Sequence, residues 1–477
     1  MGLIGEIQRI FCIENLTVLE RMKIVEISFE VEAKSLPTFA EIEKLLSLIP
    51  DRDVLKIDLI SDSEEIFVIM SSNKFSGDDY QTFCRELDSE SYLRISISID
   101  KNVVDCTFSI YNFKSFAEDI LESDITQVMA GFSILMRNCN YLVFDLFDQN
   151  LFFTTTSMAF VSGNRTSFSS KLQRSKRLIS CKETTYFYNV NDYNLLPDDF
   201  FIEINYEDNP LTDLFNRICT ILSLAYISSS SSIVENYLKI QISGQRNIDF
   251  SYQLINLKNN IELFKIYSWI YTDGSSIDKG IIARNIISLH CKYSDLINID
   301  EKTFSSIQSN YNLYLKNNVT QYLDLKNKLA DFICNVVSKT GDYATSLLAS
   351  FKTNLIAIFG FLFTVILANI VSDQPLENIF TRDITAIIEF VLLGSAIYLI
   401  ICIFETKYKL KKAEESYFSL KENYNNVLSD IDLEEIFSGD NLINKTTRSV
   451  NKGILIYSLL WTGFLIIAFL LVEYIST

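Results

Sequence analysis

The sequence predicts an α+β cytosolic region, followed by a helical stalk and a three-span α-helical transmembrane module. Two observations lead to this fold class. Segments that alternate polar and apolar residues, which is typical of strands, lie before residue 255. Three apolar stretches near the end of the chain are each long enough to cross the roughly 30 Å hydrocarbon core of a bilayer as a helix. These stretches are Thr353–Ser372, Ile384–Phe404 and Gly453–Val472.

Residues 1–206 are predicted to form an α+β sensor region, in one or two subdomains. Helical periodicity predicts helices at Phe39–Ile49 and Phe113–Met136. Alternation and β-branched residues predict strands at Lys23–Glu32, Leu55–Ile60, Glu65–Met70, Leu93–Ile99, Val103–Ile110, Tyr141–Phe147, Leu151–Phe160, Thr184–Val190 and Phe200–Asn205.

Residues 207–300 are predicted to be mainly helical. A run of serines at Ser228–Ser232 is typical of a loop, and Gly244 separates two segments that could form a hairpin, Tyr237–Ile242 and Asn247–Leu254. Helices are expected at Leu211–Ile227, Leu257–Tyr271 and Ile277–Leu296.

Heptad spacing predicts helices that continue the spans outside the membrane. The first is a stalk helix over residues 301–352, which leads into the transmembrane hairpin of residues 353–404. The second stalk helix, with a loop, occupies residues 405–452 and leads into the last span, in residues 453–477. We expect the two stalk helices to pair antiparallel, although an ordinary amphipathic surface helix fits the same spacing. The seam residues are Tyr322, Leu325, Leu329, Phe332 and Val336, then Leu410, Ala413, Tyr417, Leu420, Tyr424, Val427 and Ile431.

Charge predicts the topology. The segment of residues 405–452 is basic at both membrane edges, whereas the short loop Asp373–Asp383 is net acidic. Lysines follow the second span, and Lys445, Arg448 and Lys452 precede the third. The positive-inside rule then places residues 1–350 in the cytoplasm and the C-terminus outside. The start of the chain does not read as a secretory signal. The nine cysteines form no CxxC pair, which favours reduced thiols over disulfides or a zinc site.

Composition weighs against several functions. A net charge of −18 disfavours a protein that coats nucleic acid nonspecifically. The single histidine, His290, lies in an apolar helical stretch, so it is better interpreted as a packed residue than as a catalytic one. Because no P-loop, GxGxxG or HExxH motif is present, we expect no enzyme activity, no metal and no cofactor.

The segment between Gln149 and Lys182 contains no acidic residue and holds six basic ones. Serine and threonine hydroxyls lie between them and suit phosphate oxygens. This pattern makes the segment the candidate site for an anionic ligand, while a solvated basic loop or contact with lipid headgroups is the alternative. The candidate residues are Arg165, Lys171, Arg174, Lys176, Arg177 and Lys182.

Two polar residues in the spans are candidate pore residues. Glu389 lies in the second span, where an ionised carboxylate costs about 2.5–3.5 kcal/mol at the bilayer centre. In a ring of subunits its copies would attract cations, whereas near the end of the span it would simply reach the headgroups. Asn369 is the weaker candidate. Three spans are too few for a wide pore, so we expect a homo-oligomer, with a tetramer as the predicted number.

The layout resembles the membrane effectors of bacterial anti-phage defence, and within them it is similar to the Hailong channel family. The resemblance rests on the three C-terminal spans, the stalk and the basic stretch 165–182. It implies an oligomeric ion channel that depolarises the bacterial inner membrane. It also implies gating by a nucleotide or short DNA oligomer, which a nucleotidyltransferase encoded nearby would supply. The alternative function is a membrane-anchored scaffold without a pore.

Overall fold

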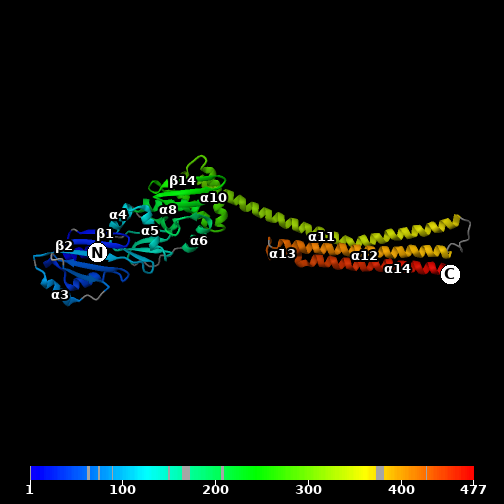
Figure 1. Cartoon of the computed structure of the whole chain (residues 1–477), viewed down its shortest axis with the longest axis horizontal. Coiled ribbons are helices and arrows are strands. Elements are labelled where there is room, and N and C mark those ends of the chain that lie inside the picture. The colour runs from blue at the N-terminus through cyan, green and yellow to red at the C-terminus, as the bar shows by residue number, and fades with distance from the viewer. Residues whose placement is uncertain are drawn as a thin grey trace. The chain divides into compact units, whose positions relative to one another are not determined.

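The computed structural model describes residues 2–476, apart from residues 15, 62–64, 73–75, 89, 149–150, 164–171, 206–208, 372–380 and 426 (Figure 1). The chain forms two compact units, Met1–Leu313 and Tyr314–Thr477. The expected fold class is confirmed, because an α+β region precedes long helices and three of these are long and apolar enough to cross a membrane.

The first lobe of unit one is an antiparallel sheet covered by helices on one face. The strand order is β1-β2-β5-β3-β4. Alternation sets the covered face, since Val25, Ile27 and Phe29 of β2 are buried with apolar residues of α1 and α2, and the residues between them are exposed. The elements are α1 (Leu3–Phe11), β1 (Thr17–Glu20), β2 (Ile24–Glu32), α2 (Phe39–Leu46), β3 (Val54–Ile60), β4 (Ile66–Met70), α3 (Gly77–Glu86) and β5 (Tyr92–Asp100).

The second lobe holds two further sheets that share one core. One sheet has the order β11-β8-β9-β7-β6 and the other β10-β12-β13-β14. The strands are β6 (Thr107–Ile110), β7 (Leu142–Leu146), β8 (Phe153–Thr155), β9 (Met158–Ser162), β10 (Tyr186–Phe187), β11 (Ile202–Ile204), β12 (Ser230–Val234), β13 (Tyr237–Ser243) and β14 (Asn247–Gln253). The helices are α4 (Phe113–Glu122), α5 (Ile125–Leu135), α6 (Arg174–Thr184), α7 (Pro197–Phe200), α8 (Thr212–Ile227), α9 (Ile261–Tyr271) and α10 (Ser276–His290).

Helix α8 forms the centre of this second core. Twelve of its sixteen residues are buried, as expected of a helix that is covered on all sides. The core extends from Phe108 to Ile307 and therefore runs across residue 206, where the sequence predicts a boundary between regions.

The structure corrects three predictions in the second lobe. The serine run is not a loop, because Ser230–Val234 is strand β12, whose buried Ser231 hydroxyl donates to the Ala225 carbonyl. The helix expected over residues 113–136 is interrupted at Ser123 and Asp124, whose extended backbone separates α4 from α5. The strand expected from Val103 begins only at Thr107, because Asp105 and Cys106 adopt left-handed backbone in a tight turn.

Unit two is a bundle of long helices. They are α11 (Glu301–Val371), which begins within unit one, α12 (Arg382–Tyr424), α13 (Asp430–Phe437) and α14 (Asn441–Ser476) (Figure 1). The predicted antiparallel pairing of the stalk helices is confirmed. Leu329 and Ile333 of α11 share a core with Tyr417 of α12, while farther along α11 Asn354 meets Ser395, which lies earlier in α12.

The seam of α12 is shorter than predicted. Leu410 and Tyr417 are buried as expected, but α12 ends at Tyr424. Val427 and Ile431 lie beyond this end and are 61% and 79% exposed. Ser429 instead caps α13 by accepting the Asp432 N–H, so the chain reverses and enters α14.

Candidate functional site

The basic segment forms helix α6 from Arg174 onward, while Arg165 and Lys171 lie outside the described residues. Arg174 faces inward and is 3% exposed. Its Nε lies 3.0 Å from Oδ1 of Asp199 and its Nη2 lies 2.9 Å from Oδ2. Asp199 also accepts hydrogen bonds from the Ser157 hydroxyl and the Leu196 N–H. Arg174 is therefore fully engaged within the core and fixes α6 to it.

The other basic residues of α6 do not form one cluster. Lys176 and Lys182 are exposed, but they lie six positions apart, so they project about 120° apart around the helix. Arg177 is partly buried, and its Nη2 donates to the Thr272 hydroxyl at 3.2 Å. Its Nη1 is buried and has no hydrogen-bond partner within the described part of the chain.

Arg177 connects α6 to an aromatic hollow. Thr272 also lines a hollow of about 470 Å³, together with Phe264, Trp269 and Phe304. Lys279 borders the same hollow and donates to the carbonyls of Trp269, Thr272 and Asp273, which caps the end of α9. An aromatic wall beside a guanidinium is a suitable surface for an aromatic anion.

A buried carboxyl group lies near Arg177 and was not singled out from the sequence. Burial raises the pKa of Asp198, although the nearby Arg177 and a hydrogen bond from the Tyr267 hydroxyl oppose this shift. The Pro197-Asp198-Asp199 run at the start of α7 is the one signal that could have indicated it, because Pro and Asp are typical of helix starts.

The candidate pore residues lie in the long helices. Glu389 is partly buried on α12, beside the buried stripe that includes Ile388 and Leu392. One turn earlier, the buried Thr385 hydroxyl has no hydrogen-bond partner among the described residues. The side chain of Asn369 lies outside the described part of the structure.

His290 ends α10, and its Nδ1 lies 3.0 Å from the Thr303 hydroxyl, as expected for a packed histidine. Among the residues that the structure describes, no group of three or more His, Cys, Asp or Glu side chains is placed to hold a metal ion.

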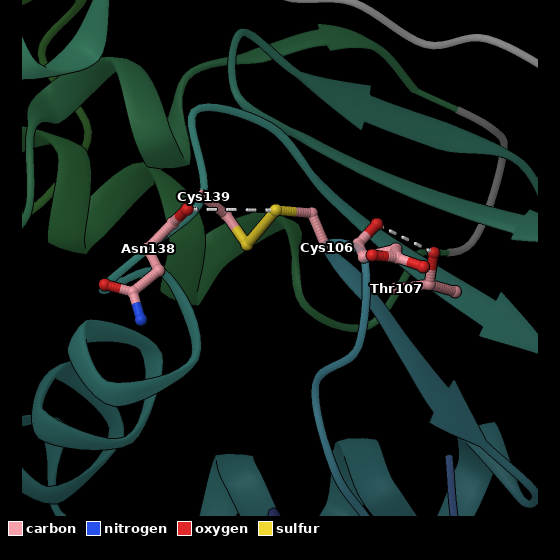
Figure 2. The surroundings of a disulfide bond; sticks show 5 residues. Cys106, Thr107, Asn138 and Cys139 are labelled. Carbon is pink, nitrogen blue, oxygen red and sulfur yellow. Dashed lines mark hydrogen bonds between the residues drawn. A yellow bond between two sulfur atoms is a disulfide. The ribbon is translucent and has the colours of Figure 1, made fainter. Parts of the chain in front are cut away.

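The cysteine prediction is wrong at one pair. Figure 2 shows a disulfide between Cys106, in the turn before β6, and Cys139, after α5. Their Cα atoms lie 5.6 Å apart although 33 residues separate them in sequence. The β6–α4–α5–β7 crossover brings the two positions together, because β6 and β7 pair in parallel. The other seven cysteines are free.

Comparison with known proteins gives no relative for this chain. No family model, no curated protein and no solved structure matches it.

Proposed function

We propose that this protein is an oligomeric membrane effector that acts as an ion channel in anti-phage defence by depolarising the membrane. In this proposal a nucleotide or short DNA oligomer binds the α+β region and gates the channel. The protein catalyses no reaction and needs no cofactor. A nucleotidyltransferase encoded nearby supplies the ligand, and the resemblance to the Hailong channel family is the basis for that part.

One observation carries the membrane part of the proposal. The three apolar helices keep large apolar side chains exposed in the single chain; Phe359, Phe390 and Phe404 are 54%, 75% and 71% exposed. Such side chains require lipid or further copies of the chain around them. Glu389 lies at the edge of the packed stripe, where a neighbouring copy could cover it.

The ligand part is supported by α6 and the aromatic hollow. Lys176 and Lys182 are exposed and free to approach phosphates, and the aromatic side chains Phe264 and Trp269 line the hollow that a base would enter. Arg174 has a structural role and is not a part of this ligand site, because its guanidinium is already bound by Asp199.

Conductance tests the proposal directly. Full-length protein reconstituted in planar bilayers should conduct ions, and Glu389→Gln should reduce cation selectivity. Glu422→Gln is the matched control, because it removes the same charge from the exposed far end of α12. Short DNA should change the conductance, and Lys176→Glu with Lys182→Glu should abolish that response. Absence of conductance with and without DNA would overturn the channel.

A membrane-anchored scaffold is the second candidate. It is favoured by the interior of the three-helix bundle, which is filled by side chains such as Ile358, Leu392, Leu399 and Trp461. A chimera distinguishes the two functions. If the spans serve only as an anchor, replacing them with an unrelated anchor preserves activity, whereas a channel loses it.

A further inference from the structure

A groove between α11 and α12 combines positive charge with aromatic side chains. Its volume is about 300 Å³. None of the lining residues is acidic, and three of them are lysines. Its lining includes Lys339, Tyr343, Tyr408, Lys409 and Lys412.

The depth of this groove relative to the bilayer follows from the packing of the three spans. A polar layer joins them, because Trp461 Nε1 donates to the Ser395 hydroxyl, which donates to Asn354 Oδ1. Trp461 and Ser395 each lie about 12–14 Å inside the ends of their apolar stretches at Gly453 and Phe404.

The corresponding point on α11 lies near residue 345, eight residues before Thr353, where the hydropathy of the sequence places the start of this span. The same distance back from Asn354 reaches it. The close approach of α14 to α11 supports this position, because a Cβ added at Gly453, where the apolar stretch of α14 begins, would lie 2.8 Å from the Ala344 Cβ. Lys352 then lies on the hydrocarbon side of this edge. It is exposed on the bundle surface, where a long lysine side chain can extend toward the headgroups. Tyr343 and Tyr408 therefore lie at the edge of the hydrocarbon, where tyrosine is enriched in membrane proteins.

The lysines of the groove lie at the depth of lipid headgroups. Lys339, Lys409 and Lys412 are within about 12 Å of the apolar edge, on the side of the spans that leads to α13. Side chains of a helix lean toward its N-terminus. Because α12 begins at the opposite membrane face, Lys409 and Lys412 lean toward the bilayer.

Two of these lysines have no carboxylate partner among the described residues. Lys409 pairs with Glu405 at 2.6 Å, whereas Lys412 Nζ lies 5.5 Å from the centre of the Tyr408 ring, and Lys339 forms no ion pair in the described part. An exposed apolar stripe continues from the groove into the span and consists of Tyr408, Phe404, Ile401 and Ile397.

We propose that this groove is a binding site for one anionic phospholipid. Lys339 and Lys412 bind the phosphate, Tyr343 and Tyr408 contact the glycerol level, and an acyl chain lies along the exposed stripe of α12. Basic grooves between helices at a membrane surface bind anionic headgroups in this way. The proposal requires only that the helices span a membrane, so it holds whether or not the protein conducts.

The test measures lipid retained by the full-length protein. Protein purified in detergent is incubated with phosphatidylglycerol or phosphatidylcholine, and retained lipid is counted by native mass spectrometry. We expect preferential retention of phosphatidylglycerol. Loss of either Lys339 or Lys412 should weaken the binding of phosphatidylglycerol roughly fivefold, so Lys339→Gln with Lys412→Gln should weaken this binding about thirtyfold.

The matched control is Lys407→Gln with Lys411→Gln. These two exposed lysines lie at the same membrane edge of α12 but do not line the groove. The control should retain phosphatidylglycerol as the wild type does. Equal loss in both double variants would overturn the proposal in favour of a diffuse basic belt. Displacement of the lipid by millimolar glycerol phosphate would overturn it in favour of a free phosphate site, and equal retention of both lipids would overturn it outright.

Discussion

Arg174 and Lys176 lie two residues apart on α6, yet their environments differ completely. The sequence presents both as members of one basic run. Arg174 is buried against Asp199, which lies 25 residues later, whereas Lys176 is exposed. The difference follows from helical geometry, because the inward stripe of α6 contains Arg174, Leu178 and Cys181.

Replacing Arg174 should therefore destabilise the second lobe. Arg174→Met leaves the Asp199 carboxylate buried without its partner, and breaking such a pair typically costs about 3–5 kcal/mol. Lys176→Ala should change the free energy of unfolding by less than about 0.5 kcal/mol, because the residue is exposed. Thermal denaturation of the full chain in detergent checks both. Equal melting temperatures for the two variants would contradict the structural role of Arg174.

The first lobe should lose stability in acid through Glu6. Hydrogen bonds from Arg9 and Lys44 lower the pKa of Glu6 from 4.5 to about 2. Because the folded pKa is the lower one, the stabilisation is complete above pH 4.5 and is lost as the pH falls toward 2. The melting temperature of the wild type should therefore exceed that of Glu6→Gln at pH 7, and the two melting temperatures should converge near pH 2. Glu14→Gln, which changes an exposed residue of the same lobe, should show no such convergence.

At the scale of elements, alternation was a sufficient guide where strands cover one face of a core. Residues 24–32 and 237–243 form strands close to the predicted bounds because their buried positions alternate regularly. The loop predicted for the serine run is wrong because serine is common in loops, so its sequence pattern does not indicate a strand. Its hydroxyl at Ser231 is satisfied in the core by the Ala225 carbonyl, a contact that sequence alone does not reveal.

The spans likewise depend on contacts that hydropathy does not report. Ser395 is buried in the polar layer and connects Asn354 of α11 with Trp461 of α14. Hydrogen bonds between transmembrane helices are worth about 0.6 kcal/mol on average and up to about 1.7. The layer therefore contributes modestly to stability and sets which turns of the three helices face one another.

Removing the central hydroxyl should loosen the bundle. Ser395→Ala leaves the fully buried Trp461 N–H without an acceptor, so we expect a loss of about 1–2 kcal/mol. Thr462→Ala is the control, because its exposed hydroxyl donates to the Ser458 carbonyl of its own helix. Thermal unfolding in detergent, followed by tryptophan fluorescence, measures the difference. If Ser395→Ala and Thr462→Ala have the same melting temperature, the polar layer does not stabilise the bundle.

At the scale of the whole molecule, the sequence predicted the fold class and the three apolar helices but not the chemistry of the candidate site. Periodicity and hydropathy are local properties, so nine to twenty residues reveal them. The partners of Arg174 and Cys106 are distant in sequence, at Asp199 and Cys139. Only the fold brings such pairs together, and this is why the sequence reveals neither the buried position of Arg174 nor the disulfide.

The disulfide also changes the argument for topology. Unpaired cysteines would agree with a cytoplasmic location of residues 1–350, because disulfides are rare there, whereas the location itself is predicted from charge. With Cys106 bonded to Cys139, the orientation rests on the charge asymmetry around the spans. Lys407, Lys411 and Arg448 lie on one side of the spans, and Thr381 lies on the other.

Thiol labelling in intact cells decides the orientation. Cys334 is exposed on α11, on the basic side of the spans, and Thr381→Cys places a thiol on the opposite side. In a Cys12→Ser background, a membrane-impermeant maleimide should label Thr381→Cys in the intact cells, whereas Cys334 should react only after permeabilisation. The reverse pattern would place the α+β region outside the cell, where the Cys106–Cys139 bond would be stable and a cytosolic nucleotide could not reach α6.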